Sequence, residues 1–332
     1  MGQRVTSADV ARMAGVSRAT VSYVLNDTPH QTISEGTRGR VLSAAAALGY
    51  APSAAARALR TGRSDVVLCL LPDWPIGDEV GALLSNLSSA FARRGLTFVV
   101  HPASRDDRPI SELWKALTPA AVLAFGDFSD LSEEEMSAMR AAGVAPVVPL
   151  AGGSGGARRE LDPAQQRVGR LQAQYLAGLG HTILGYAYPD DHRLRFFADP
   201  RLAGVRAGCS ALSLDPPSVA TVPLSPGAAV AAVESWRARG VTAVCAYNDE
   251  VALAVLAGVR LAGLRAPEDL AVIGVDDIPA ARLADPPLTT VTTDQAAVAV
   301  HLAASVVDAI VGKQTAPEKP LDAVAVVARA SA

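Results

Sequence analysis

The chain has 332 residues, enough for about two domains of ordinary size with a large buried core. Half of the residues are hydrophobic but only 5% are aromatic, so we expect Ala, Val and Leu to fill that core. The formal net charge of -3 argues against a nucleic-acid protein when the whole chain is averaged, because phosphate binding requires a basic surface.

Several classes of protein and site are excluded by particular residues. Three scattered cysteines without a CxxC pair fit a reducing compartment and predict small buried apolar side chains: Cys69, Cys209 and Cys245. The histidines show no metal-site spacing, and there is neither a P-loop nor a dinucleotide fingerprint, so we expect no metal and no cofactor. The chain has no signal peptide and no apolar run of about 18 residues, which favours a cytoplasmic protein with no membrane role.

The charge is unevenly distributed along the chain. Residues 1–64 contain eight arginines and three acids, a net charge of +5, which leaves -8 for the remaining residues. A basic head on an acidic body predicts a nucleic-acid module joined to a second, different domain. Chance clustering on a solvated surface is the alternative that charge alone leaves open.

The head has the pattern of two short helices joined by a tight turn. Apolar residues recur at helical spacing after Thr6 or Ser7, either of which can be the N-cap, and Gly15 suits the positive φ of a helix end. A second helix is predicted to follow Ser17, and a third is predicted to begin near Ser34. This arrangement is typical of a helix-turn-helix.

In a helix-turn-helix the second helix enters the major groove, and its first residues reach the base edges. Arg18, Ala19 and, one turn later, Tyr23 occupy these positions; an arginine can contact guanine through two hydrogen bonds, and an alanine methyl can meet a thymine methyl. Other short polar groups and helix N–H groups can hold phosphates. The remaining predicted contacts of the head are Thr6, Ser17, Thr20, Ser22, Asn26 and Tyr50. A plain helical hairpin with solvated polar groups is the alternative.

Three segments resemble the N-terminus of the LacI/GalR family of bacterial transcriptional repressors: VTSADVARMAGVSRATVSYVLN, ISEGTRGRV and LGYAPSAAARALRTGRS. The similarity continues over essentially the whole chain. The resemblance implies a homodimer that binds a near-palindromic operator in double-stranded DNA. It also implies a nucleoid-associated regulator, most often a repressor in this family, that a small-molecule effector controls.

Residues 51–64 form an Ala-rich segment too short to be a stable helix alone. By resemblance to the family, this segment is the hinge helix, which orders when two copies meet in the operator's minor groove. The resemblance places Leu59 as the wedge that kinks the DNA, Ala56 and Arg60 at flanking minor-groove positions, and Arg57 beside the backbone. A flexible linker is the alternative, and both descriptions can hold because the family folds this segment on DNA.

From residue 65 onward, short apolar strands alternate with helices, which predicts parallel sheets with helices on both faces. Two successive runs of this pattern indicate two similar α/β lobes, with a ligand site in a cleft between them. The expected strands are 66–72, 96–102, 120–125, 145–151, 183–189, 219–224, 242–248 and 270–277, and a helix is expected at 202–212.

The similarity to the family is strongest over residues 266–294 and implies a periplasmic-binding-protein-like effector core. The predicted domains are a helix-turn-helix (1–50), a hinge (51–64) and an effector-binding and dimerisation domain (65–332). The chain of this fold crosses between lobes three times. We therefore expect lobe 1 at about 65–161 and 293–320, and lobe 2 at about 162–292 and 321–332.

The predicted effector contacts are the family positions Arg195, Arg201, Asn248 and Asp276, with Asp73, Trp74 and Phe125 on lobe 1. Arginine forks and carboxylates at strand ends suit sugar hydroxyls or an anionic ligand, and a sugar-like effector is expected. Trp74 could stack on a sugar or a base, or it could be a buried core residue. Helix capping or an interlobe salt bridge is the alternative for Asp249 and Asp277.

Three features depart from the family pattern. The strand at 145–151 lacks the usual terminal acid, GGSGGARRE replaces a short connection, and PDWPIGDE at 72–79 is an unusual first loop. A regulator that has lost its effector is therefore one alternative, and a sugar-binding protein of the same fold with no DNA role is another. The G-x-S-x-G match at 152–156 lacks the helix that a nucleophile elbow needs, so we predict no enzyme.

Overall fold

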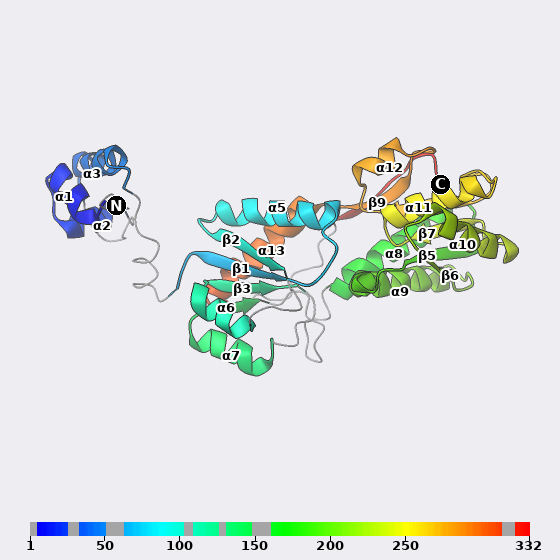
Figure 1. The fold of residues 1–332 in the computed structure, drawn as a ribbon, viewed down its shortest axis with the longest axis horizontal. Coiled ribbons are helices and arrows are strands. Elements are labelled where there is room, and N and C mark those ends of the chain that lie inside the picture. Colours follow the sequence, from blue (N-terminus) through cyan, green and yellow to red (C-terminus); the bar gives the residue numbers. More distant parts are fainter. Residues whose placement is uncertain are drawn as a thin grey trace. The chain divides into compact units, whose positions relative to one another are not determined.

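The computed structural model describes residues 5–25, 33–50, 63–102, 109–125, 131–147, 161–313 and 323–332. The chain divides into two compact units, Met1–Asp65 and Val66–Ala332. Figure 1 draws the helices of the first unit in blue and the α/β elements of the second from cyan to red.

Three helices form the first unit: α1 (Ser7–Ala14), α2 (Arg18–Leu25) and α3 (Glu35–Ala47). Gly15 ends α1 with φ 66°, in the left-handed region that favours glycine. Val10, Val21 and Val41, one from each helix, are fully buried and close a small core. The predicted helix-turn-helix and the third helix are confirmed.

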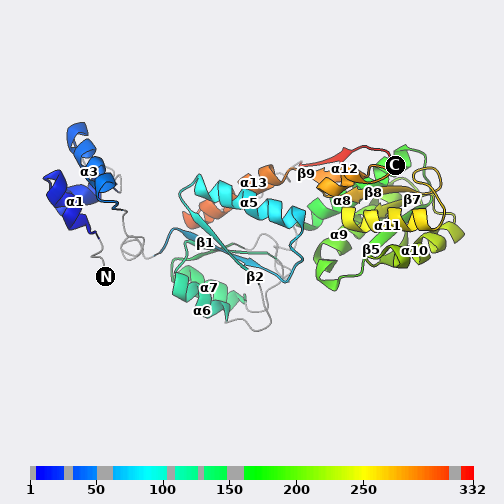
Figure 2. The same ribbon diagram turned by 45° about the horizontal axis from the view of Figure 1, so that its top comes forward.

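Lobe 1 of the second unit contains a parallel sheet in the order β2-β1-β3-β4. Its strands are β1 (Val66–Leu71), β2 (Thr97–Pro102), β3 (Ala121–Ala124) and β4 (Ala145–Val147). Its helices are α5 (Asp78–Ala92), α6 (Ile110–Leu117), α7 (Glu133–Ala141) and α13 (Gln295–Ile310). Side chains alternate along β1, so that Val67 and Cys69 pack with α5 and α13 while Leu68 and Leu70 pack with α6 and α7. Figure 2 shows α5 and α13 side by side.

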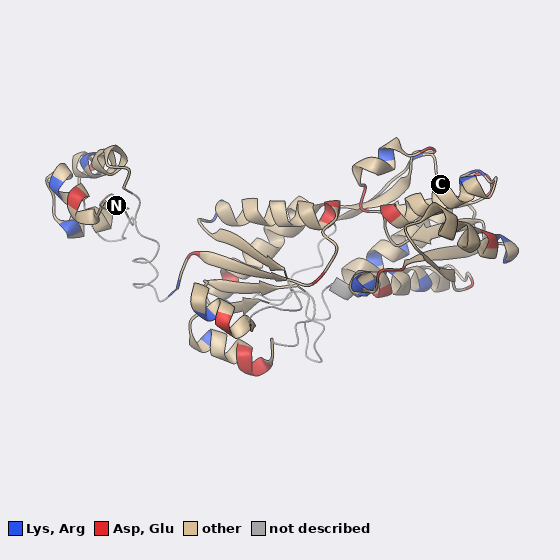
Figure 3. Cartoon of the chain, in the orientation of Figure 1, with Lys and Arg blue, Asp and Glu red and all other residues tan. Residues whose placement is uncertain are grey.

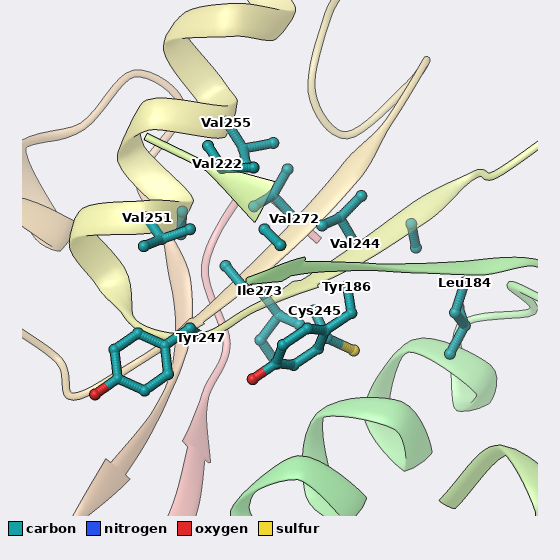
Figure 4. Close-up of a cluster of buried hydrophobic side chains, with 14 of the residues drawn as sticks. Leu184, Tyr186, Val222, Val244, Cys245, Tyr247, Val251, Val255, Val272 and Ile273 are labelled. Carbon is teal, nitrogen blue, oxygen red and sulfur yellow. The ribbon is translucent and has the colours of Figure 1, made fainter. Parts of the chain in front are cut away.

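Lobe 2 contains a sheet in the order β10-β9-β8-β7-β5-β6. Its strands are β5 (Leu184–Pro189), β6 (Ser218–Val222), β7 (Ala243–Ala246), β8 (Ala271–Val275), β9 (Thr289–Thr293) and β10 (Val324–Val327). Its helices are α8 (Leu161–Gly178), η2 (His192–Leu194), α9 (Arg195–Ala211), α10 (Pro226–Ala238), α11 (Asp249–Leu261) and α12 (Pro279–Leu283). Figure 4 shows Tyr186 and Cys245 on the side of the sheet that faces the green helices, with Val251 and Val255 of α11 on the other. This core is rich in Val and Ala, as the composition predicted.

The backbones of α8 and α9 touch where two glycines leave room. A β-carbon on Gly169 would lie 1.9 Å from the carbonyl oxygen of Arg201, and one on Gly204 would lie 2.0 Å from that of Gln166. Such distances are far below van der Waals contact, so only glycine permits this crossing. The crossing brings α9 close enough for the Arg201 Nε to donate to Gln165 Oε1 at 2.7 Å.

The two α/β lobes with parallel sheets are confirmed, with three differences in detail. β10 pairs with β9 in the antiparallel direction at the edge of lobe 2. β9, a run of β-branched residues, was not among the expected strands. α9 begins at Arg195, seven residues before the predicted helix, and contains Pro200.

Other expectations concern single residues and segments. The three cysteines are free and buried, as predicted. Across the ranges described above, no helix is both long and apolar enough to cross a membrane. The same ranges contain no group of three or more His, Cys, Asp or Glu side chains placed to hold a metal ion. The G-x-S-x-G segment and the end of the strand expected at 145–151 lie outside the described residues.

Candidate functional site

The first unit presents the N-terminal part of α2 to solvent. Val21 and Val24 anchor this helix in the core, which leaves Arg18 and Ala19 exposed and Tyr23 37% exposed. An arginine fork, a methyl group and a phenol therefore project from the helix that a helix-turn-helix inserts into the major groove.

The ends of α1 and α2 are held by short polar side chains. Ser17 Oγ accepts from the backbone N–H of Thr20 at 3.0 Å and lies 2.9 Å from its hydroxyl. The backbone N–H and the hydroxyl of Thr6 both donate to the Asp9 carboxylate, at 2.9 and 2.7 Å, and these hydrogen bonds lower the pKa of Asp9. These caps lie at the N-terminal ends of α1 and α2, the helix ends at which phosphate contacts occur in DNA complexes.

The other predicted DNA contacts are placed as follows. Ser22 lies on α2, and Tyr50 packs partly buried against the core of the three helices. The rest lie outside the described residues: Asn26, Ala56, Arg57, Leu59 and Arg60.

In the second unit, the loop after β1 joins the two lobes through an aromatic cluster. The ring centroid of Trp74 is 6.3 Å from that of Phe125 in lobe 1, and 5.5 and 4.7 Å from those of Phe196 and Phe197 in lobe 2. Trp74 is only 9% exposed, so it is buried by the contact between lobes. Beside it, the exposed Asp73 lies 3.5 Å from Arg193 of η2.

A polar cluster lies at the carboxyl ends of the lobe 2 strands. Arg201 donates to the Tyr247 carbonyl at 2.8 Å and to Asp276 Oδ1 at 3.4 Å, and its guanidinium lies 4.9 Å from the centre of the Tyr247 ring. Asp276 follows β8 with φ 109°, a strained conformation for a residue other than glycine. Burial lowers the pKa of Arg201, but the charges of Asp276, Tyr247, Tyr186 and Glu79 raise it above its ordinary value.

Three neighbouring side chains have structural roles. Asn248 caps α11, its Oδ1 accepting from the N–H of Val251 at 3.0 Å. Asp249 is fully buried and accepts from the Thr290 hydroxyl at 2.6 Å. Asp277 lies 2.5 Å from Arg329 and 3.2 Å from Arg282, which are both in lobe 2, so these salt bridges form within one lobe and not between the lobes as the alternative expected.

Glu79 brings an acid from lobe 1 to this polar cluster. It lies in the first turn of α5 and accepts a hydrogen bond from Gln295, at the start of α13. Burial, together with the charges of Asp276 and Asp249, raises the pKa of Glu79 to about 7, although the hydrogen bond from Gln295 and the charge of Arg201 lower it. Burial likewise raises the pKa of Asp249 to about 7 and that of Asp276 to about 6, despite the nearby Arg201. Figure 3 draws the acidic first turns of α5 and α11 in red.

Two family models match the chain. The model described as "Bacterial regulatory proteins, lacI family" covers residues 6–53, and the "Periplasmic binding protein-like domain" covers residues 173–332. The HTH-type transcriptional repressor PurR of Vibrio vulnificus is 30% identical over 300 residues, 86% of each chain. The chain belongs to the LacI family of bacterial regulatory proteins. The predicted resemblance is confirmed.

The chain is also similar to two further transcriptional regulators. The HTH-type transcriptional regulator CelR of Thermobifida fusca is 30% identical over 330 residues, 95% of this chain and 94% of the relative. The solved CelR–cellobiose complex has a TM-score of 0.64 at 28% identity and covers 99% of this chain and all of that one. The lac repressor dimer bound to operator and the anti-inducer ONPF has a TM-score of 0.75 at 23% identity, covering 99% of both chains, and supports the fold.

Four of the effector residues predicted for this LacI-family chain lie in two groups in the structure. Trp74 and Phe125 belong to the aromatic cluster, and Arg201 and Asp276 form the polar pair. Arg195, at the start of α9, is exposed and hydrogen-bonds to Tyr188, whose hydroxyl donates to Asp199 at 2.6 Å.

Sequence reasoning missed several side chains at these groups. Glu79 was placed in the loop 72–79 and given no role, and Phe196 and Phe197 lie before the helix expected at 202–212. Tyr247 contributes its ring and its carbonyl to Arg201 although it was taken only as strand. The one sequence signal that could have pointed to Glu79 was the unusual loop 72–79, which contains both Trp74 and Glu79.

Proposed function

We propose that the protein is a sequence-specific transcriptional regulator, acting as a repressor, that binds a near-palindromic operator as a homodimer. The observation that carries this proposal is the exposed start of α2, where Arg18, Ala19 and Tyr23 project from a helix-turn-helix. The net charge of +5 on residues 1–64 favours phosphate binding by the same unit. Two-fold symmetry of the dimer would require two matching half-sites.

A small molecule bound between the lobes is proposed to control DNA affinity. Support comes from Arg201 and Asp276 at strand ends of lobe 2 and from Trp74 of lobe 1, which are the residue types that orient a polar ligand against an aromatic face. The CelR complex contains a sugar, cellobiose, and a sugar-like effector is the starting proposal here. The effector would favour one arrangement of the lobes and thereby shift the population that binds DNA.

Each part of the chain has its own role in the proposed function. Residues 1–50 would bind the major groove, residues 51–64 would form the hinge in the minor groove, and residues 65–332 would bind effector and dimerise. Such a regulator would act in the cytoplasm. No catalytic role is proposed, because the relatives compared above are named as transcriptional regulators.

The test is binding of the full chain to DNA. A palindrome from its own promoter region should bind at least about a thousandfold more tightly than random DNA of equal length, with affinity falling steeply as salt rises. Equal affinity for both DNAs would refute sequence-specific binding. Deletion of residues 1–60 should abolish DNA binding, and any ligand binding by the remainder should persist.

A further inference from the structure

The polar cluster between the lobes contains more carboxyl groups than cations. Glu79 of lobe 1 interacts electrostatically with Asp276, Asp249 and Arg201 of lobe 2, which makes three carboxyls and one guanidinium, the latter 3.4 Å from Asp276. Asp249 is held by the Thr290 hydroxyl and by the Ile278 N–H at 2.9 Å, neither of which carries a charge. Glu79 is held by the Gln295 amide, which is also neutral. When these carboxyls are ionised, the site therefore carries more negative than positive charge.

The arginines near this site are already engaged. Arg201 donates to Asp276, to Gln165 and to the Tyr247 carbonyl. Arg193 lies 2.6 Å from Asp191 and 3.5 Å from Asp73. Asp277 forms salt bridges with two more arginines, Arg282 and Arg329. Arg195 hydrogen-bonds to Tyr188. In the described part of the site, each of these arginines already has a carboxylate, carbonyl or hydroxyl partner that partly offsets its attraction for an anionic ligand.

Aromatic faces adjoin the acidic groups. Phe197 and Arg201 are one turn apart on α9 and thus lie on the same face of that helix. Phe197 contacts Trp74, which in turn lies in the loop that leads into Glu79 and α5. Aromatic rings beside carboxylates are the combination that binds ammonium groups, through cation–π attraction and charge-assisted hydrogen bonds.

A buried hydroxyl is also left without a partner. Tyr186 is fully buried, and its hydroxyl finds no hydrogen-bond partner among the described residues. Figure 4 shows this hydroxyl pointing to the side on which Tyr247 lies, the residue whose ring Arg201 covers. Burial raises the pKa of Tyr186, and the charge of Arg201 lowers it in part. A buried phenol can accept a hydrogen bond from a donor-rich ligand group.

We propose that the effector of this protein carries a protonated amine, held by Glu79 and Asp276 and seated beside the aromatic rings of Trp74 and Phe197. The inference rests on the proposed function, because it assigns a chemical class to the ligand of the interlobe site. It replaces the neutral or anionic ligand expected from the residue types alone.

The first test compares matched ligands on the full chain by isothermal titration calorimetry at neutral pH. The probes are glucosamine against glucose, and choline against its uncharged carbon analogue 3,3-dimethylbutan-1-ol. At least one amine should bind about tenfold or more tightly than its neutral partner. Equal or tighter binding of both neutral partners overturns the proposal, and so does the absence of any amine binding below about 10 mM. Operator binding, measured on the same sample, reports the proposed function separately.

The second test measures how many protons the protein releases when the amine binds. The carboxyls of Glu79, Asp249 and Asp276 have raised pKa values, and an arriving cation lowers the pKa of each. Amine binding should therefore release protons, which titrations in phosphate and in MOPS buffer detect as a buffer-dependent enthalpy. Binding without proton release, or with proton uptake, contradicts a cation placed at these carboxyls.

The third test uses the variant Glu79→Gln, with Glu134→Gln on the exposed start of α7 as the matched control. Glu79→Gln should reduce the preference for the amine over its neutral partner about tenfold and reduce proton release, while the control keeps both. An unchanged preference in Glu79→Gln overturns the role of this residue. Operator binding by each variant verifies that the chain is folded.

Discussion

The indole of Trp74 in lobe 1 packs against the ring of Phe197 in lobe 2, with the ring centroids 4.7 Å apart. Replacing Phe197 with Ala should expose Trp74, because this contact buries part of the indole. The other two tryptophans, Trp114 and Trp236, are 4% and 0% exposed and will contribute little to any change. We expect a red-shifted emission and stronger quenching by acrylamide. Phe98→Ala, which removes only the stack on Phe91, is the control, and equal quenching in both variants would contradict the interlobe contact.

The substitution Gly204→Ala should destabilise the second unit. Its β-carbon would lie 2.0 Å from the Gln166 carbonyl oxygen, so α8 and α9 must separate, at a cost of about 1–3 kcal/mol or more. Denaturant unfolding followed by tryptophan fluorescence measures this loss, since all three tryptophans lie in Val66–Ala332. Gly81→Ala is the matched control: it lies within α5, meets no atom within 4 Å, and should be neutral or stabilise by up to about 1 kcal/mol.

Glu79→Gln should change how stability depends on pH. The pKa of Glu79 is raised from 4.5 to about 7, so the folded state binds more protons than the unfolded state between these values. Its contribution to the free energy of unfolding is therefore lost as pH rises from about 4.5 to about 7. Relative to the wild type, the variant should gain about 1–2 kcal/mol between pH 5 and pH 8, after allowance for solvent screening. A pH-independent difference between the variant and the wild type would refute the raised pKa.

Arg18→Ala should relax base preference at the operator. A bidentate arginine–guanine contact discriminates between bases by about 1–3 kcal/mol, and the exposed position of Arg18 at the start of α2 permits it. Competition binding with single-base operator variants will identify the position at which preference disappears. Equal losses of affinity on operator and random DNA would instead assign Arg18 to a phosphate.

Leu59→Ala tests the hinge, which lies outside the described residues. If this leucine wedges between central base pairs, its removal should weaken operator binding about tenfold or more while half-site preference stays unchanged. DNA bending, measured by the mobility of circularly permuted fragments, should decrease in parallel. Unaltered bending with intact affinity would rule out the wedge.

The elements that sequence analysis predicted correctly are those with local causes. Gly15 ends α1 because a turn needs positive φ, and Ser17 caps α2 because its hydroxyl reaches the N–H of Thr20. The strands of both lobes were recognisable because a strand buried on both faces is a continuous apolar run. β9 was missed because its Thr-rich sequence, TTVTT, lacks that apolar signal although three of its residues are buried by packing.

By itself, the sequence determined the basic helix-turn-helix, the alternation that builds two α/β lobes, and the family, because each depends on residues close together in the chain. Only the tertiary structure decided the character of the interlobe site. Arg201 and Asp276 meet across 75 positions, and Glu79 joins them from the other lobe. The raised pKa values of Glu79 and Asp276 arise from burial and from neighbours distant in sequence, and neither can be read from residue order.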